Sequence, residues 1–211
     1  MCSSDLSCAS CRDPSHAYAD ARPRPVGARG DLLLRNAPSL LNVAYAPALG
    51  WRDEGIASLE QQMRRPLFAT EPVEMGLAGR EATVLAMLRT DAGYAADFVA
   101  AFPGESEPVT VDNLIRAIAS FERTLVSGPT AFDRYVFEAD LGAMSPAARR
   151  GMTLFFSART GCAQCHGGPA LAGTLRALGH EDAPSVYVAT GVGDKSEEHT
   201  SELQSLAYLV C

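Results

Sequence analysis

Positive charge is scarce in this chain of 211 residues, and lysine is almost missing from it. The chain has 18 Lys and Arg against 25 Asp and Glu, which gives a formal net charge of −7. Lys195 is the only lysine, so every other basic residue is an arginine. A nucleic-acid-binding protein needs a basic stripe that displaces counterions from phosphates. The composition therefore argues against binding to nucleic acid.

Long apolar runs are missing as well. No stretch approaches the roughly 20 apolar residues that a helix needs to cross a bilayer. Residues 1–6 lack the basic and apolar segments of a secretory signal peptide. Taken literally, these absences would predict a cytoplasmic protein. The composition is that of an ordinary globular chain, long enough for one large or two small domains.

Both ends of the chain look foreign to its body. Residues 1–6 can be encoded by GTG TGC TCT TCC GAT CT, with GTG as an alternative start codon. The reverse complement of this DNA, read from its fourth base, encodes residues 196–200. Both ends resemble a translated sequencing-library adapter, and the single lysine, Lys195, lies at the second junction. We expect residues 1–6 and 195–211 to be non-native, with a native body of about residues 7–194. An ordinary polar tail is the alternative.

Four of the six cysteines form two C-x-x-C pairs, Cys8 with Cys11 and Cys162 with Cys165. His166 follows the second pair directly and completes a C-x-x-C-H motif. Two thiols on one helical turn can each form a thioether to a haem vinyl group, and the next residue can ligate the iron. The spacing therefore predicts covalent haem c at Cys162 and Cys165, with His166 as ligand to the haem iron.

Two other classes of site share the C-x-x-C spacing. A zinc site would bring two such pairs together, and nothing in the sequence requires that. A thioredoxin-like dithiol would need a βαβ frame, which the sequence pattern lacks. Haem attachment is the interpretation that the histidine favours.

The first pair departs from the haem motif, because Arg12 stands where the ligand histidine belongs. Arginine stays protonated and has no lone pair to offer iron. Three explanations remain open: haem attachment without the usual ligand, a site that has lost its function, or one misread base. His16 is close in sequence and could be recruited as a ligand, although a surface histidine in a polar loop is the more ordinary role.

Helical periodicity dominates the rest of the chain and predicts a mainly α fold. Thr110 is a candidate N-cap for the clearest helix, and Ser145-Pro146 opens a later one. Residues 185–189 are the only strand candidate. The predicted helices cover residues 57–65 (ended by Pro66), 80–88, 95–102, 111–126 and a segment from 146 to 155. The expected core stripe of the clearest helix is Val111, Leu114, Ile115, Ile118, Phe121 and Leu125.

Several segments together resemble the bacterial di-haem cytochrome c peroxidase/MauG family. They occur in the order, and at the distances, that are typical of the family, across nearly the whole native body. The segments are 6–14, 35–42, the region of Trp51, 72–75, 117–125, 132–135 and 154–162.

The resemblance implies two cytochrome-c-like haem domains, the second truncated. Residues 7–140 would form the peroxidatic domain, with haem on Cys8 and Cys11. Residues 141–194 would begin the electron-transfer domain, with its haem on the Cys162 motif.

The resemblance also assigns individual roles. Trp51 matches a tryptophan between the haems, where it would act as an electron bridge or only pack in the core. Glu74 matches the acidic residue beside the peroxide-binding face, with Gln62 as its amide partner; outside the family, Glu74 would be read as a solvated loop residue. Asn36 matches a residue that helps to hold calcium, or simply forms a turn. Some relatives carry a distal histidine where this chain has Ala28.

These roles predict a periplasmic enzyme that reduces hydrogen peroxide with electrons from a small donor protein, such as a cytochrome c or a cupredoxin. A homodimer is compatible with the resemblance. Two alternatives remain, a MauG-like peroxide-dependent oxidase and a non-enzymatic electron-transfer cytochrome. Arg12 and the truncated second domain would impair peroxidase turnover in this chain.

Overall fold

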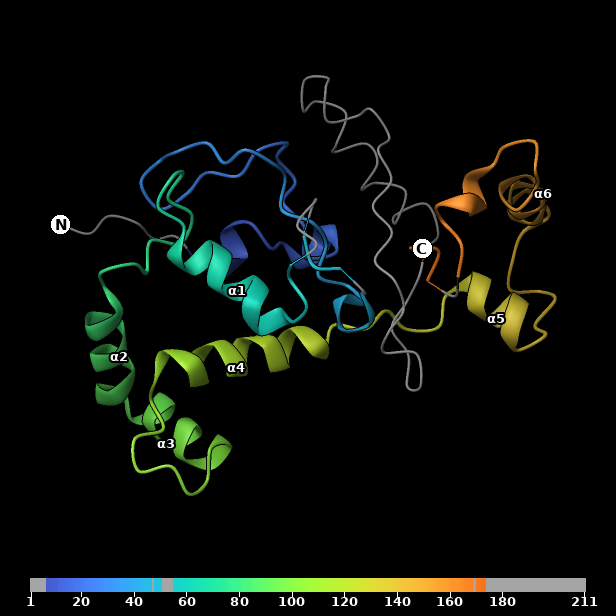
Figure 1. Cartoon of the computed structure of the whole chain (residues 1–211). Coiled ribbons are helices and arrows are strands. Elements are labelled where there is room, and N and C mark those ends of the chain that lie inside the picture. Colours follow the sequence, from blue (N-terminus) through green and yellow to red (C-terminus); the bar gives the residue numbers. More distant parts are fainter. Residues whose placement is uncertain (1–6, 47, 51–54, 169, 174–211) are drawn as a thin grey trace.

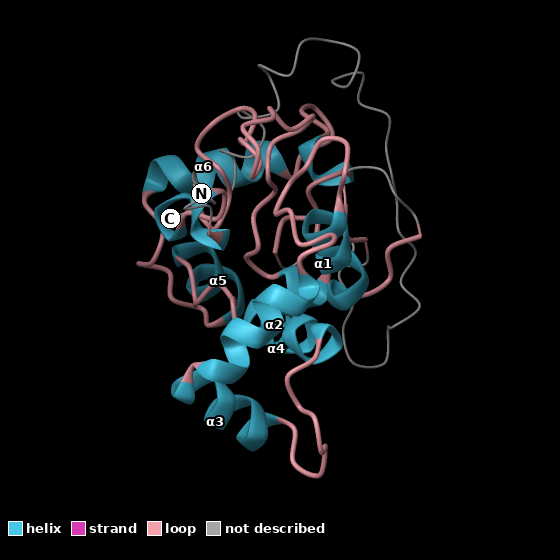
Figure 2. Ribbon diagram, turned by 90° about the vertical axis from the view of Figure 1, so that its left-hand side faces the viewer, coloured by secondary structure: helices cyan, strands magenta, loops and turns pink. Residues whose placement is uncertain are grey.

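The computed structural model describes residues 7–46, 48–50, 55–168 and 170–173. Within these ranges the chain forms six α-helices, four short 3-10 helices and no β-sheet. Figure 2 shows helices joined by loops. The prediction of a mainly α fold is confirmed. Trp51, the strand candidate at 185–189 and both adapter-like ends lie outside the described residues.

Helices α1 (Leu59–Phe68) and α4 (Val111–Arg123) pack together at the centre of the fold (Figure 1). Ser58 caps α1 by accepting the Gln61 amide, and Thr110 caps α4 by accepting the Asn113 amide. The predicted cap at Thr110 is therefore confirmed. The apolar residues of both helices recur at intervals of three and four, so each helix buries one face. Two clusters result, the first of Leu49, Ile56, Leu59 and Ala119 and the second of Met63, Leu67, Leu77 and Ile115.

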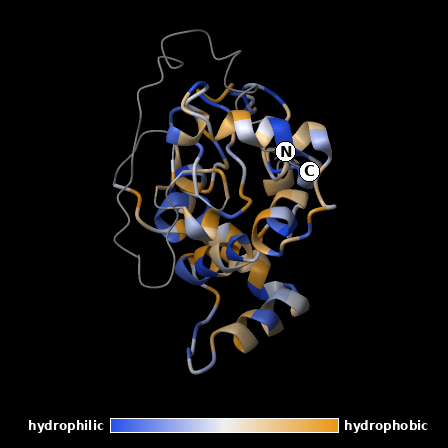
Figure 3. Ribbon diagram, turned by 90° about the vertical axis from the view of Figure 1, so that its right-hand side faces the viewer, coloured by the Kyte–Doolittle hydropathy of each residue, from blue (hydrophilic) through white to orange (hydrophobic). Residues whose placement is uncertain are grey.

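Helices α2 (Glu81–Thr90) and α3 (Ala92–Ala101) form a hairpin near the N-terminal end of α4 (Figure 1). Asp91 is the only residue between them, and its side chain accepts the amides of Gly93 and Tyr94. Beyond the other end of α4 lie α5 (Ala131–Phe137) and α6 (Pro146–Phe155). Helices in this fold carry hydrophobic and hydrophilic faces, visible in Figure 3.

Helix α1 continues past Pro66, where the sequence predicted its end. Proline lacks an amide hydrogen and usually ends a helix. Here the last turn is held from outside, because the Met75 amide donates to Pro66 O at 2.9 Å and the Leu77 amide to Leu67 O at 2.9 Å. The segment after α1 therefore stabilises the turn that the proline weakens.

The predicted core stripe of α4 is wrong at Phe121, which is 56% exposed. Its neighbour Glu122 is buried instead, at 4% exposure. Ile115, Ala119 and Glu122 are spaced by four and three residues and therefore share one face, whereas Phe121 is turned well away from it. The other members of the predicted stripe hold, because Ile115 and Leu125 are buried and Val111, Leu114 and Ile118 are partly buried, so the prediction fails only at Phe121.

Helix α5 was not predicted from the apolar pattern, since it has only seven residues. A local signal does mark its start. Thr130 and Asp133 form a capping box in which each side chain accepts the other residue's amide, at 3.2 and 2.7 Å. At α6, the predicted opening is confirmed, because Ser145 accepts the Ala148 amide.

Candidate haem-binding sites

The first C-x-x-C pair lies on the 3-10 turn η1, Cys8–Ser10. The Cys11 amide donates to Cys8 O at 3.3 Å. Across the same turn, the Ser7 amide donates to Ser10 Oγ at 3.1 Å and the Ser10 amide donates to Ser7 O at 2.9 Å. Cys8 is exposed, Cys11 is partly buried, and both are free thiols. The turn therefore holds two free thiols three residues apart, as thioether attachment requires.

The second pair lies on a turn of the same kind, η4, Cys162–Gln164. The Cys165 amide donates to Cys162 O at 3.2 Å, and the His166 amide donates to the same oxygen at 2.9 Å. Both cysteines are free thiols, and His166 is exposed. The turn and the residue that follows it therefore present two thiols and one imidazole, which is the donor set of a c-type haem.

Aromatic side chains of α5 and α6 lead up to His166. The Phe155 ring centroid lies 6.5 Å from that of His166, and Phe156 lies 5.1 Å from Phe155. Phe132 of α5 stacks on Phe156 at 6.2 Å. An apolar, aromatic neighbourhood suits a flat porphyrin. The residues of the second site therefore fit a covalently held haem.

At the first site the ligand position is filled by the partly buried side chain of Arg12, which donates a hydrogen bond from Nη1 to the carbonyl oxygen of Pro38. Burial lowers the pKa of Arg12, although the charges of Glu122 and, more weakly, Glu74 oppose that shift. A guanidinium has five donors and no acceptor. The residues at the first site therefore offer two thiols but no axial ligand at position 12.

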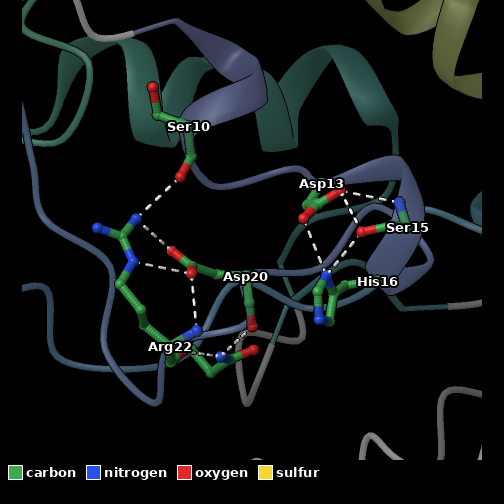
Figure 4. A network of polar contacts seen from close by, with 7 residues as sticks. Ser10, Asp13, Ser15, His16, Asp20 and Arg22 are labelled. Carbon is green, nitrogen blue, oxygen red and sulfur yellow. Dashed lines mark hydrogen bonds and ion pairs between the residues drawn. The ribbon is translucent and has the colours of Figure 1, made fainter.

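A charged network holds the first turn in place (Figure 4). The Arg22 guanidinium binds the Asp20 carboxylate through two nitrogens, at 3.0 and 2.8 Å, and donates to Ser10 O at 2.8 Å. The Asp20 side chain is only 4% exposed. Burial alone would raise the pKa of Asp20, but the hydrogen bonds from Arg22 outweigh it and the net shift is downward. Burial and the Asp20 charge raise the pKa of the Cys11 thiol, against the opposing charges of Arg22 and Arg12.

Asn36 belongs to the same network. Its amide nitrogen donates to Asp20 O at 3.0 Å and to Arg22 O at 2.5 Å, and the residue is 2% exposed. Asn36 thus links the carbonyl oxygens on both sides of residue 21. In the part of the chain that the structure describes, no three His, Cys, Asp or Glu side chains gather into a group that could hold a metal ion. The calcium role of Asn36 stays a prediction.

His16, the alternative ligand, lies on the turn η2, Pro14–His16. Its Nδ1 contacts Asp13 Oδ2 at 2.9 Å and Ser15 Oγ at 3.0 Å (Figure 4). The ring is exposed. One ring nitrogen is therefore engaged within its own turn.

Glu74 is partly buried and lies within electrostatic range of Arg12. Burial raises the pKa of Glu74, and the Arg12 charge partly offsets that rise. The Ala28 amide donates to Glu74 O at 2.7 Å, so the loop without the distal histidine lies against this residue. The close approach of this loop to Val73 requires glycine at position 27, because a Cβ there would lie 1.9 Å from Val73 O.

Gln62 is partly buried on α1, and its backbone amide donates to Ser58 O at 3.0 Å. Among the described residues, no hydrogen bond joins the Gln62 side chain to Glu74. The structure therefore brings Glu74 towards Arg12 but does not pair it with Gln62. The catalytic roles of Glu74 and Gln62, and that of Trp51, which lies outside the described residues, stay predictions.

Glu122 is a residue that the sequence analysis missed. It is 4% exposed on α4, and its Oε2 accepts no hydrogen bond among the described residues. Burial raises the pKa of Glu122, opposed by the charges of Arg12 and then Arg123. Its spacing of three and seven residues from Ala119 and Ile115 places it on their face of α4, a relationship that is visible only once the burial of those two residues is known.

Comparisons with known proteins agree on one relationship. The profile of the di-haem cytochrome c peroxidase family matches residues 2–140. Methylamine utilization protein MauG of Methylorubrum extorquens is 38% identical over 164 residues, which are 78% of this chain and 44% of that protein. Cytochrome c551 peroxidase of Pseudomonas aeruginosa is 30% identical over 205 residues, or 97% of this chain and 57% of that protein.

A solved structure supports the same relationship. The crystal structure of a MauG-like protein associated with microbial copper homeostasis matches with a TM-score of 0.79 at 33% identity, over 87% of this chain and 51% of that one. The chain thus spans about half the length of the relatives it matches. No helix in the described ranges is long and apolar enough to cross a membrane.

Proposed function

Because the chain belongs to the di-haem cytochrome c peroxidase family, we propose that it is part of a protein that reduces hydrogen peroxide with electrons passed from its second haem site to its first. The observation that carries this proposal is the second motif, where two free thiols and His166 share one turn. Residues 7–140 would form the peroxidatic domain, and residues 141–194 would begin the electron-transfer domain.

Cys162 and Cys165 would hold the haem c of the second site, and His166 would ligate its iron. When bound, the haem supplies an iron centre that accepts and passes on single electrons. The hydrogen bond between the His166 amide and Cys162 O fixes the backbone of His166 relative to that of Cys162. Phe155 would supply an apolar neighbour on one side of the histidine ring.

Glu74 is the proposed proton-handling residue. Reduction of peroxide needs a proton moved from one peroxide oxygen to the other, and a carboxyl group in a poorly solvated place suits that task. Burial raises the pKa of Glu74, which favours a proton on its carboxyl group. Gln62 would hold the peroxide through its side-chain amide, and Trp51 would assist electron transfer between the two sites.

Arg12 would prevent peroxide reduction by the chain itself. The donor set of the first motif does not fit an axially ligated haem, because a guanidinium has no lone pair to give. We therefore propose that the chain as it stands carries haem at the second site and does not turn over peroxide. This favours the electron-transfer cytochrome as the second candidate function.

A MauG-like oxidation is the remaining alternative. Ala28 lies beside Glu74 and has no side chain that could ligate a metal, so the distal loop at this position offers no iron ligand.

A small electron-donor protein, either a cytochrome c or a cupredoxin, is proposed as the partner, in a periplasmic setting. Homodimerisation and a calcium ion at Asn36 are further proposals that follow from the family.

Spectroscopy of the haem-loaded chain tests the proposal. The chain is produced with a c-type maturation system, and the His166→Ala variant is compared with His16→Ala as the matched histidine control. Loss of the native iron spectrum in His166→Ala alone is the expected result. An unchanged spectrum in His166→Ala would contradict the assignment of His166 as ligand.

A further inference from the structure

The first C-x-x-C motif holds two thiols that the proposed function leaves without a task. Cys8 and Cys11 are free, and Arg12 follows them where an iron ligand would be needed. At the second motif His166 completes the donor set for haem c, so its cysteines already have a proposed partner. Since the first motif is proposed to carry no haem, its two sulfur atoms stay available for other chemistry.

The 3-10 geometry of η1 brings positions 8 and 11 into register. The Cys11 amide donates to Cys8 O at 3.3 Å, which is the hydrogen bond between residues three apart that defines a 3-10 turn. In such a turn, side chains three residues apart lie one above the other, and three rises of about 2.0 Å place their Cα atoms roughly 6 Å apart. A disulfide bridges Cα atoms about 4.4–6.8 Å apart. The turn can therefore close into a ring without rearranging its backbone.

The same turn is held in shape by its neighbours. The Ser7 amide donates to Ser10 Oγ at 3.1 Å, and the Ser10 amide donates to Ser7 O at 2.9 Å. From outside the turn, Arg22 Nη2 donates to Ser10 O at 2.8 Å. A segment that is already ordered loses little further conformational entropy when a new bond closes it. The fold therefore favours a bond between the two sulfur atoms more than a flexible chain would.

The two thiols differ in their surroundings. Cys8 is exposed, whereas Cys11 is partly buried. Arg22 Nη2 lies 4.0 Å from Cys11 Sγ and also binds the Asp20 carboxylate, whose side chain is only 4% exposed. An external reagent therefore reaches Cys8 first, and Cys11 is the inner thiol.

We propose that the first motif of this chain is a dithiol–disulfide couple, in which Cys8 reacts with an external disulfide and Cys11 closes the ring. The assignment rests on the proposed function in one respect, namely that no haem occupies this motif. Disulfides form and persist in oxidising compartments, of which the proposed periplasmic setting is one.

The reaction is thiol–disulfide exchange, with a small-molecule disulfide such as oxidised glutathione as the oxidant. The Cys8 thiolate attacks one sulfur of the reagent, forms a mixed disulfide and releases one glutathione. The Cys11 thiolate then attacks the Cys8 sulfur, the bond between Cys8 and Cys11 forms, and the second glutathione leaves. Two electrons and two protons thus pass from the cysteines to the two glutathione molecules.

Peptide mapping of the full chain tests the ring. Cys2 and Cys211 are replaced by serine, so that the two motifs hold the only cysteines, and the chain is produced with a c-type maturation system. After treatment with oxidised glutathione, free thiols are blocked with N-ethylmaleimide and the tryptic peptide of residues 1–12 is weighed. We expect a peptide without haem or maleimide that is two hydrogens lighter than its reduced form.

The other outcomes of that measurement separate the two proposals. Haem on the peptide of residues 1–12 would show that the proposed function is wrong about the first motif, and would overturn the disulfide with it. A haem-free peptide that carries two maleimides, or glutathione that stays on Cys8, would overturn the disulfide alone.

Mixtures of oxidised and reduced glutathione measure how strongly the folded turn favours the ring. We expect the equilibrium constant for oxidation of Cys8 and Cys11 to be about tenfold or more larger in buffer than in urea, because the 3-10 turn already holds both positions in register. Equal constants in buffer and urea, or a smaller one in buffer, would overturn the role of the turn.

Two single-cysteine variants test the order of reaction. Cys11→Ser leaves Cys8 alone and should trap a glutathione mixed disulfide on it. Cys8→Ser leaves Cys11 alone, and its mixed disulfide should form several-fold more slowly, because Cys11 is partly buried beside Asp20 and Arg22. A faster reaction at Cys11 than at Cys8 would overturn the assignment of Cys8 as the attacking thiol.

Discussion

Arg12 donates a hydrogen bond from Nη1 to the carbonyl oxygen of Pro38. A histidine that ligates a metal usually donates its second ring N–H to a backbone carbonyl or carboxylate, which fixes the orientation of the ring. Arg12 donates to such a carbonyl but brings no lone pair for iron. Position 12 therefore offers a hydrogen-bond donor and no iron ligand.

Glu74 is predicted to control the rate of peroxide reduction once position 12 is a histidine. In an Arg12→His chimera that continues into the C-terminal half of a family member, Glu74→Gln should lower the turnover rate by about 10²–10⁴-fold. The reason is that an amide cannot shuttle the proton. Glu71→Gln, an exposed carboxyl group in the same loop, is the control. Turnover that is equally fast in the Glu74→Gln and Glu71→Gln chimeras would exclude Glu74 from catalysis.

Asp20 is predicted to give the fold a stability that disappears in acid. Its folded-state pKa lies below the unfolded value, so its contribution is present above about pH 4 and is lost as the pH falls through the folded-state pKa. Asp20→Asn should cost about 1–3 kcal/mol at pH 7 and much less near pH 3. Urea unfolding of both chains at the two pH values measures this.

The control for that experiment is Asp97→Asn, an exposed aspartate on α3. Its effect should be small at both pH values. If Asp20→Asn costs the same at pH 3 as at pH 7, the ion pair with Arg22 is not the source of the stability.

The Thr110 cap is predicted to stabilise α4. Thr110→Ala removes the side-chain acceptor of the Asn113 amide, which lies 3.1 Å from Thr110 Oγ1, and should lower the free energy of unfolding by about 1 kcal/mol. Ser120→Ala, on the exposed face of the same helix, should change stability by a few tenths of a kcal/mol at most. Thermal unfolding of the two variants compares them, and a Thr110→Ala protein as stable as Ser120→Ala would speak against the cap.

The helices could be predicted from the sequence where the signal is local. Thr110 and Ser145 cap the helices that follow them as expected, because a cap depends only on residues two or three positions away. The face that a helix buries depends on its neighbours. Phe121 is exposed and Glu122 is buried for that reason, and no rule of apolar spacing would have chosen the glutamate.

The candidate sites also differ in how far their features depend on local sequence. The spacing of the second motif predicts haem attachment at Cys162, Cys165 and His166 without any structure, because thioether chemistry requires neighbouring residues, and this assignment stays a prediction. The hydrogen bond from Arg22 to Ser10 O joins residues 12 positions apart through an irregular loop, which no pattern of residue types encodes. The adapter-like ends at 1–6 and 195–211 lie outside the described residues and stay a prediction.

Haem stoichiometry tests the central claim most directly. The chain and its Arg12→His variant are produced with a c-type maturation system, and covalent haem per chain is measured by the pyridine haemochrome assay with peptide mapping of the two motifs. The account predicts haem on the Cys162 peptide of both chains, and on the Cys8 peptide only after Arg12→His supplies an imidazole. Full haem loading of the Cys8 peptide in the Arg12 chain, or none on the Cys162 peptide, would contradict it.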